Sequence, residues 1–498
     1  MSKFKRGVSL VIAVIMAAAV LMSGCAQERD EKKGEGTKGT ETTSGGLKPY
    51  ELLWYSVGTP QNDTDLVFEE VSKYTKEKIN ASVKMVQFDW GEYNERMQVI
   101  IAAGEKFDIC FTSSWANYYS PNVARGAFFP LNDLLDKYGK GIQQVIPQAF
   151  WDGIRVKGEI YAVPCNKELG EQAVWRFNKE YVDKYNLDIS EVRSLESLEP
   201  LLKTVKENET FYPISADAQF KPYVHLDYLL GDSFPFAVKM DGKDYKIVNK
   251  WEQPEMIRTL EVMHRYFKAG YVRPDVATVK SGDDTDTGLW FVGKAHTQPL
   301  ADILWSRSLG YDVVSVPIHD PIVTNGSTSG SMQAISITSE EPERAMMFLD
   351  LVNTDKYLRN LIDSGIEGVH YEMVNGRQKD LQAGLDRYDM PTFAFGNIMI
   401  TNLYEADPPD KWDAFQAFNA ACVKAPTLGF IVDRDPVETE LTAIRNVEDE
   451  FDEPLYSGSV DPHEYIPKAV QKMKEAGFDK ARDELQRQLD TWREENKK

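Results

Sequence analysis

Apolar residues alternate with polar ones in some segments and recur every three or four positions in others. The order of these segments predicts an α/β fold. From residue 50 the pattern alternates between strand and helix, over residues 51–55, 63–78, 81–88, 90–103 and 107–111. This βαβαβ order predicts a parallel sheet with right-handed crossovers. In such sheets ligands bind beyond the carboxyl ends of the strands, which are expected here at 55–60 and 111–115.

The middle of the chain predicts a crossing between two lobes and a return. Residues 158–164 are interpreted as a tight turn into a strand that Pro164 ends, and 173–178 as the next strand. We interpret this pair as the crossing from the first lobe to the second. Residues 289–296 and 300–305 are expected to bring the chain back towards the hinge. Further elements are predicted at 194–207 (helix), 251–269 (helix), 332–338 (strand) and 342–353 (helix).

The C-terminal third is predicted to be mostly helical. Asp435-Pro436 and Asp461-Pro462 each place a capping residue before a proline, which is a helix start signal. The segment after the first signal carries one apolar face, formed by Leu441, Ile444, Val447 and Phe451.

The first 25 residues have the pattern of a secretory signal. Lys3, Lys5 and Arg6 precede an apolar run over 8–22, and small residues then lead to Cys25. The run is shorter than the roughly 20 residues that a membrane-spanning helix needs. The small residues and Cys25 resemble a bacterial lipobox, in which the thiol is diacylated and becomes the mature N-terminus, although Met22 stands where leucine is commonest. The alternative is an ordinary signal peptide with an incidental cysteine.

The segment that follows Cys25 is expected to be a disordered tether. Residues 26–48 are almost free of apolar side chains, so they cannot bury enough surface to offset the entropy of ordering. A polar tether behind a lipidated cysteine would hold a folded body near the outer face of a membrane without embedding it.

Composition narrows the range of partners. The full chain has 78 acidic and 57 basic residues, a net charge of −21, and removal of the signal's three cations makes the mature chain more acidic still. Nucleic acid is therefore excluded as a partner, because phosphate binding needs a basic surface. The chain also has ten Trp, 23 Tyr and 23 Phe residues. Aromatic side chains suit a sugar-binding cleft, although most are expected in the core.

No cofactor, metal or catalytic motif is predicted. Cys110, Cys165 and Cys422 lack the paired spacing of a metal site, and free buried thiols are the expectation. The GxSxG pattern fails at 326–330, where Thr328 occupies the nucleophile position. His463-Glu464 is not followed by the second histidine of a zinc site.

Several short segments together resemble the bacterial extracellular solute-binding proteins of ABC importers, and within them the LplA-type lipoproteins of Gram-positive bacteria. The matching segments are 107–112, 158–164 (GEIYAVP), 293–295, 339–345 (SEEPERA), 365–371, 395–397, 429–430 and 486–492. Each is weak alone, but their order along the chain is specific. The resemblance covers residue 50 to the end.

The resemblance implies a two-lobe periplasmic-binding-protein-like α/β fold with a hinge, an interlobe cleft and extra C-terminal helices. It implies no catalysis, carbohydrate or a related polar solute as cargo, and ABC permease subunits as partners. We expect a monomer at the outer face of the membrane. The expected organisation is a signal peptide (1–24), a lipidated cysteine and tether (25–48), lobe 1 (50–165 and 297–355) and lobe 2 (166–296 and 356–498).

A two-lobe trap for a sugar needs flat apolar faces for CH groups and polar side chains for hydroxyls. Strand ends and the hinge should supply them. The candidate ligand-binding residues are Trp54, Thr59, Asp63, Thr112, Trp115, Trp175, Asn178, Tyr228 and Trp305. For each tryptophan the alternative is a packing role. An aspartate placed like Asp63 is more often a helix N-cap than a sugar ligand, and it can be both. Trp90, Trp251 and Trp492 are interpreted as helix-packing residues.

Two other functions stay open at this level. A secreted glycan-active enzyme is one, since acidic pairs are abundant, although abundance alone produces close pairs by chance. The other is the same trap binding a peptide or another polar solute.

Overall fold

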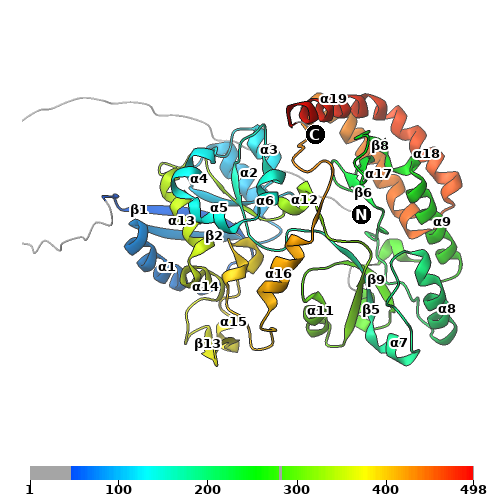
Figure 1. Cartoon of the computed structure of the whole chain (residues 1–498), viewed down its shortest axis with the longest axis horizontal. Helices are drawn as coiled ribbons and strands as arrows, with labels where there is room; N and C mark the ends of the chain where they lie inside the picture. The colour runs from blue at the N-terminus through cyan, green and yellow to red at the C-terminus, as the bar shows by residue number, and fades with distance from the viewer. Residues whose placement is uncertain (1–45, 280–282, 497–498) are drawn as a thin grey trace, which may run out of the picture. The chain divides into compact units, whose positions relative to one another are not determined.

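The first strands form close to where the sequence predicts them. The computed structural model describes residues 46–279 and 283–496 (Figure 1). In it β1 (Tyr50–Val57) lies between β2 (Ala81–Phe88) and β3 (Ile109–Thr112) and pairs with both in parallel. The sheet continues through β12 (Met332–Ile335) to β4 (Ala162–Pro164), both antiparallel to their neighbours. The predicted βαβαβ unit is confirmed.

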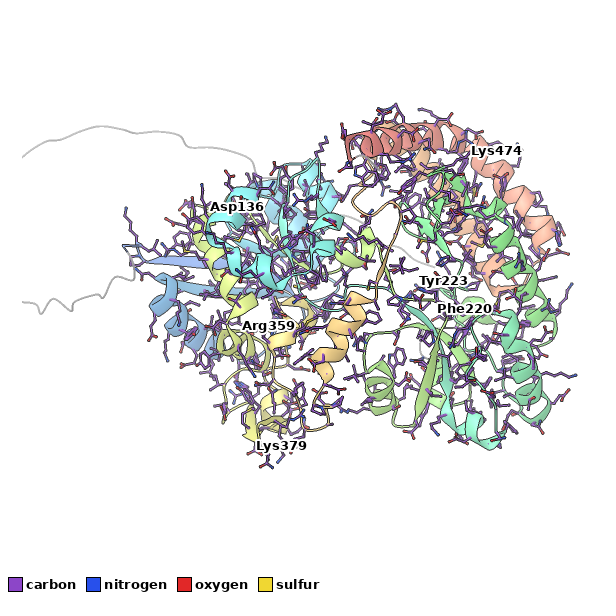
Figure 2. The ribbon with its side chains drawn as sticks, in the orientation of Figure 1. Asp136, Phe220, Tyr223, Arg359, Lys379 and Lys474 are labelled. Carbon is purple, nitrogen blue, oxygen red and sulfur yellow. The ribbon has the colours of Figure 1, made fainter. Side chains whose placement is uncertain are left out.

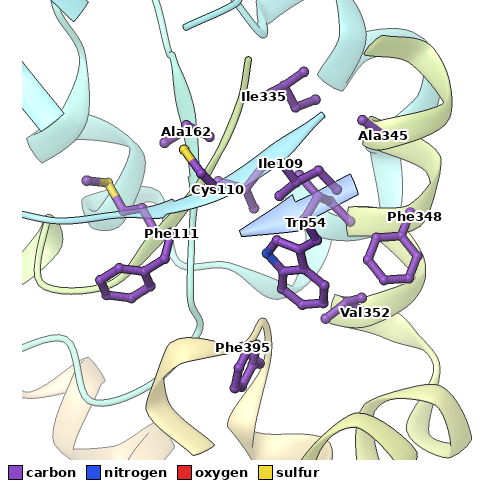
Figure 3. Close-up of a cluster of buried hydrophobic side chains, with 14 of the residues drawn as sticks. Trp54, Ile109, Cys110, Phe111, Ala162, Ile335, Ala345, Phe348, Val352 and Phe395 are labelled. Carbon is purple, nitrogen blue, oxygen red and sulfur yellow. The ribbon is translucent and has the colours of Figure 1, made fainter. Parts of the chain in front are cut away.

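Helices surround this sheet and share one hydrophobic core with it, and we call the whole the first lobe. Trp54 lies in the core and its indole faces Phe348 and Phe395 (Figure 3). The helices that contribute to this core are α1 (Thr64–Ile79), α2 (Tyr93–Ala103), α3 (Tyr119–Ala124), α4 (Asn132–Tyr138), α5 (Lys140–Val145), α6 (Gln148–Ile154), α13 (Pro342–Thr354), α14 (Lys356–Ser364) and η4 (Thr392–Ala394). Other elements between α14 and residue 400 are β13 (Tyr371–Val374), β14 (Arg377–Asp380), α15 (Gln382–Leu385) and η5 (Ile398–Ile400).

The second lobe is built on an antiparallel sheet of order β10-β5-β9 and on a second small sheet of order β6-β7-β8. Helix α9 (Pro254–Lys268) joins the two parts, because Met256 and Leu260 pack in one core and Met263 and Tyr266 in the other. The strands are β5 (Ala173–Asn178), β6 (Leu226–Tyr228), β7 (Phe236–Lys239), β8 (Val248–Asn249), β9 (Val292–His296) and β10 (Val313–Pro317). The other helices are α7 (Lys179–Lys184), η1 (Glu196–Leu198), α8 (Glu199–Asn208), η2 (Lys250–Glu252), η3 (Val276–Thr278), α10 (Asp283–Thr287), α11 (Ala301–Leu309), η6 (Asp435–Val437), α17 (Glu438–Ser457), α18 (Pro462–Glu475) and α19 (Phe478–Asn496).

Three segments of the described chain pass between the lobes and are hydrogen-bonded to one another. The first follows β4 and contains Glu171, which forms a bridge with Ile322. The second contains β11 (Ile322–Val323), which pairs in parallel with β15 (Val423–Lys424) in the third. The second segment also carries α12 (Asn325–Thr328), and α16 (Lys411–Ala420) leads into the third. These three segments are called the crossing segments below.

The lobe boundaries differ from those expected from the sequence. Residues 297–317, assigned to lobe 1, contain α11 and β10, and β10 pairs with β5 in the second lobe. Residues 356–395, assigned to lobe 2, include α14, whose Leu358 and Ile362 are buried in the first lobe's core. Strand pairing places β10 in the second lobe, and its apolar face places α14 in the first. Both depend on contacts with residues that are distant in the sequence.

The predicted signal peptide, Cys25 and the tether up to residue 45 lie outside the described residues. Across the part that is described, none of the helices combines the length and apolarity needed to cross a membrane. The expectation of free thiols is confirmed, since Cys110 and Cys165 are buried and unbridged, and Cys422 is half-buried and unbridged.

Candidate ligand-binding cleft

A cavity of about 930 Å³ opens beside the crossing segments. The cavity is lined by Trp115 and Phe393 of the first lobe, by Trp305 of the second lobe and by Glu171 of a crossing segment. Because both lobes contribute, one ligand in the cavity would contact both. The volume is within the range of known small-molecule sites.

Six aromatic side chains form flat parts of the wall. They come from the loop after β3, from α11, η4 and α16, and from the segment before α16. They are Trp115, Trp305, Phe393, Tyr404, Trp412 and Phe415. Aromatic faces of this kind pack against the CH surface of a polar ring while leaving the ring's hydroxyls free for hydrogen bonds.

Trp115 is held in place although the residue is 43% exposed. Its indole Nε1 donates a hydrogen bond of 2.8 Å to the carbonyl of Gly330. The backbone N–H groups of Trp115 and Ala116 donate to Ser113 Oγ at 3.2 and 2.8 Å. These hydrogen bonds fix the position of the exposed Trp115 ring in the loop after β3.

Trp305 and Trp412 are also supported by cations or hydrogen bonds. The guanidinium of Arg176 on β5 lies 5.2 Å from the Trp305 ring centroid. This is cation–π range. Trp412 Nε1 donates to the carbonyl of Thr401 at 3.2 Å, and Lys411 Nζ lies 4.7 Å from the Trp412 ring.

Carboxylates supply hydrogen-bond acceptors around the same cavity. Asp363 on α14 is buried and forms an ion pair of 3.0 Å with Arg359 (labelled in Figure 2). Asp407 pairs with Lys411 at 2.9 Å. Glu171 accepts a 3.0 Å hydrogen bond from Thr324 Oγ1. Glu168 pairs with Lys167. Carboxylates and aromatic faces together suit a hydroxyl-rich, uncharged ligand.

Burial also changes the pKa of Tyr404, whose hydroxyl is influenced by Asp363. Tyr404 lines the cavity, and burial, with a smaller contribution from Asp363, raises the pKa of its hydroxyl. The group therefore stays protonated and can donate a hydrogen bond at neutral pH.

Of the nine candidate residues, the cavity wall includes Trp115 and Trp305. Trp54 is fully buried, and its Nε1 donates to Gln333 Oε1 at 2.8 Å. Its neighbours Phe348 and Phe395 meet it edge-on, with centroids 5.4 and 5.3 Å away. Core packing therefore places Trp54 away from the cavity, because β1 is a central strand with helices over its face.

Three more first-lobe candidates lie outside the cavity wall. Asp63 is buried and pairs with His370 at 3.1 Å and Arg387 at 2.6 Å. It ties α1 to the segment 370–387 and makes no side-chain capping bond. Thr112 is buried and donates to the carbonyl of Asn117 at 2.6 Å. Thr59 is exposed, but the cavity does not reach it.

The second-lobe candidates other than Trp305 serve the fold. Trp175 is 2% exposed and packs in the core under β5. Asn178 caps α7, where its side chain accepts from Glu180 N at 3.1 Å. Tyr228 packs against the core of the small sheet. Trp175 and Phe177 are two positions apart on β5, so they share one face of the strand, and both pack in the core under β5.

Sequence reasoning missed Phe393, Tyr404, Trp412 and Phe415. Trp412 and Phe415 are three residues apart and share one face of α16. That spacing was the available signal, but an apolar face of a helix is compatible with core packing as well as with a cleft. Phe393 and Tyr404 lie in irregular segments, where no periodicity identifies a role.

Comparison with known proteins identifies the family. The model for bacterial extracellular solute-binding proteins matches residues 60–359. The chain belongs to this family. Its members bind solutes, so the chain is an extracellular binding protein and not an enzyme. A domain of unknown function matches residues 426–494, over the C-terminal helices.

Relatives agree with this assignment over nearly the whole chain. A carbohydrate ABC transporter substrate-binding protein of Streptococcus pneumoniae serotype 4 is 31% identical over 486 residues, 96% of each chain. The crystal structure of the N-glycan transport solute binding protein NgtS of S. pneumoniae is 32% identical with a TM-score of 0.83, covering 91% of this chain and all of that one. The predicted solute-binding fold is confirmed.

The same pneumococcal protein is known in complex with two sugars. Its complex with Man1GlcNAc has a TM-score of 0.72 at 31% identity, covering 89% of this chain and 99% of that one. Its complex with Man5GlcNAc has a TM-score of 0.70 at 32% identity, covering 91% of this chain and all of that one.

Proposed function

We propose that this protein is a lipid-anchored receptor that captures an oligosaccharide outside the cell and delivers it to an ABC importer. The cargo follows from the cavity and from the relatives. The anchor follows from Cys25 and its polar tether. The receptor acts as a monomer and passes its cargo to the permease subunits.

The single observation that carries the cargo assignment is the composition of the cavity wall. Trp115, Trp305 and Trp412 come from three separate elements and all line one cavity, together with the carboxylates of Asp363 and Asp407. A peptide or amino acid would need charged partners for its termini. The cationic side chains in the wall, Lys167 and Lys411, are already paired with Glu168 and Asp407.

The crossing segments allow ligand binding to be coupled to lobe closure. A ligand shifts a conformational equilibrium only by its differential affinity for the two states. A sugar that stacks on Trp115 in the first lobe and on Trp305 in the second gains the second contact only when the lobes close on it. A micromolar affinity corresponds to about 8 kcal/mol of binding free energy, enough to hold the closed form.

A sugar-binding screen tests the proposed cargo. The mature chain is mixed with mono- and oligosaccharides, amino acids and peptides, and the thermal unfolding midpoint is measured. We expect stabilisation by an oligosaccharide, with no turnover of that sugar, since ligands that bind the folded state raise its stability. Stabilisation by peptides alone would overturn the proposal.

Replacing Cys25 tests the anchor separately. In the producing cells, wild type is expected in the membrane fraction with an acylated N-terminus by mass spectrometry. Cys25→Ser is expected to shift the protein to the medium. Equal membrane retention of the two would show that Cys25 is not the anchor.

A further inference from the structure

Two tryptophans stand exposed side by side at one edge of the cavity. Trp90 is 44% exposed and Trp115 is 43% exposed. Their ring centroids are 6.2 Å apart and the planes differ by 22°. Phe393 lies 6.2 Å from Trp90 and 6.4 Å from Trp115. We call these three rings the aromatic ledge.

The aromatic ledge is continuous with the cavity but extends beyond it. Trp115 and Phe393 line the cavity, whereas Trp90 contacts both of those rings and is not part of the cavity wall. Exposed adjacent aromatic rings are uncommon on a soluble surface and mark binding sites. A chain of sugar units that leaves the cavity past Trp115 would next meet Trp90.

The turn that carries Trp90 is fixed to the Trp115 loop. Glu92 N and Tyr93 N both donate to the carbonyl of Asp89, at 2.9 and 3.0 Å, which closes the turn. Tyr93 Oη then donates to the carbonyl of Phe111 at 2.7 Å, and Asn94 Oδ1 accepts from the N–H of Asn117 at 2.6 Å. The turn that carries Trp90 and the loop that carries Trp115 are therefore connected before a ligand arrives, and such preorganisation of the backbone lowers the entropic cost of binding.

We propose that the aromatic ledge is an outer subsite for the sugar units of a long oligosaccharide that project from the cavity, with Trp90 as the residue that distinguishes long from short cargo. This inference rests on the proposed function and extends it to chain length. The occupant is the same glycan that fills the cavity, because the ledge continues the cavity wall. Asp89, exposed beside Trp90, supplies an acceptor for its hydroxyls.

Calorimetric titration with Man1GlcNAc and Man5GlcNAc tests the inference. Trp90→Ala is expected to weaken Man5GlcNAc binding about fivefold or more, the scale of one lost aromatic contact, and to change Man1GlcNAc binding less than twofold. Trp90→Phe should keep most of the long-glycan affinity. Tyr118→Ala is the matched control, since Tyr118 is 45% exposed in the same lobe and is neither in the ledge nor in the cavity wall.

The possible results distinguish a failure of the proposed role of Trp90 from a failure of the proposed receptor function. Equal losses for both glycans, or no loss for either, would overturn the length-reading role of Trp90. Unchanged sugar affinity with reduced permease-dependent uptake would overturn it too and assign the ledge to the permease. If the wild-type protein binds neither glycan, the inference about Trp90 is overturned. The proposed function is then tested separately, by the wider sugar screen.

Discussion

Glu171 and Ile322 exchange both of their backbone hydrogen bonds, at 2.8 and 2.9 Å. They belong to different crossing segments, so this pair joins the chain's first passage between the lobes to its second. Val423 N donates to the carbonyl of Pro321 at 2.8 Å and adds the third passage. The connection between the lobes is thus a small hydrogen-bonded ladder, and the cavity opens directly beside it.

Gly170 lies at the start of this ladder, and a glycine is required there for space. A Cβ at Gly170 would lie 2.4 Å from Cys422 Sγ and 3.2 Å from Pro321 Cβ. Gly170→Ala is expected to destabilise the fold by about 1–3 kcal/mol, as overpacking does. Gly170→Ala combined with Cys422→Ala should recover most of that loss, because the clashing sulfur is gone. Urea unfolding of the single and double variants measures this, and a double variant as unstable as Gly170→Ala would show that the clash is with Pro321 or the backbone.

Two tryptophans that look equivalent in the sequence should behave differently when replaced. Trp115→Ala removes an exposed cavity ring, and we expect at least a tenfold loss of oligosaccharide affinity with little change in stability. Trp175→Ala empties a core position that is 2% exposed, and we expect about 3–5 kcal/mol of destabilisation. Calorimetry and thermal unfolding on both variants separate the effects. A stable Trp175→Ala protein with selective loss of affinity would contradict this assignment.

Lys250 and Glu448 form a buried ion pair in the second lobe, and each charge is stabilised by the other. Lys250 Nζ lies 2.6 Å from Glu448 Oε2, and both side chains are fully buried. Glu448 Oε1 also accepts from Trp251 Nε1 at 2.7 Å. Lys250→Met should cost about 3–5 kcal/mol, because it leaves a buried carboxylate without its cation.

The double variant Lys250→Met with Glu448→Gln is expected to be more stable than Lys250→Met alone. The amide of the new Gln needs no counter-charge and can still accept from Trp251. Chemical unfolding monitored by tryptophan fluorescence would compare the two. Equal stability of the single and double variants would argue that the charge of Glu448 is not the cause of the loss.

Two histidines near the start of β5 should make stability fall at acid pH. His319 Nε2 accepts from the N–H of Ala173 at 2.9 Å, and Nδ1 lies 2.6 Å from the carbonyl of Asp320, so the ring is neutral. Burial lowers the pKa of His319. Desolvation by the surrounding cavity wall, followed by the charges of Lys294 and His319, lowers the pKa of His296 to about 4, although part of its surface is open to the cavity. Since unfolded histidine titrates near pH 6.5, the unfolded chain binds more protons below that pH.

The two neutral histidines therefore leave the free energy of unfolding at its full value above about pH 6.5. That free energy decreases as the pH falls towards about 4. Thermal unfolding midpoints across this range would show the loss. His319→Gln should reduce it, since the amide oxygen of the new Gln can accept from Ala173 without titrating. A profile for His319→Gln identical to wild type would exclude His319 as a contributor.

Local pattern was enough to predict much of the fold. The strands at 81–88 and 173–178 form with the bounds predicted from the sequence, and α1 and α13 lie within a residue or two of their predicted helices. Each of these elements depends on the spacing of its own apolar residues, which is readable in a single segment. The family resemblance carried by ordered short motifs predicted the two-lobe fold and the absence of catalysis.

The ligand-binding cleft was decided by tertiary structure. Trp54 and Trp115 both follow or lie on early strands, yet one is in the core and the other on a cavity wall. That difference comes from position along the strand, because Trp54 lies within β1 beneath packed helices, whereas Trp115 lies in the loop after β3. Trp115, Trp305 and Trp412 are separated by more than a hundred residues each and meet because three crossing segments bring the lobes together. Sequence spacing records what one element needs for its own packing, whereas a cleft depends on how elements far apart in the chain are placed, and only the folded chain sets that.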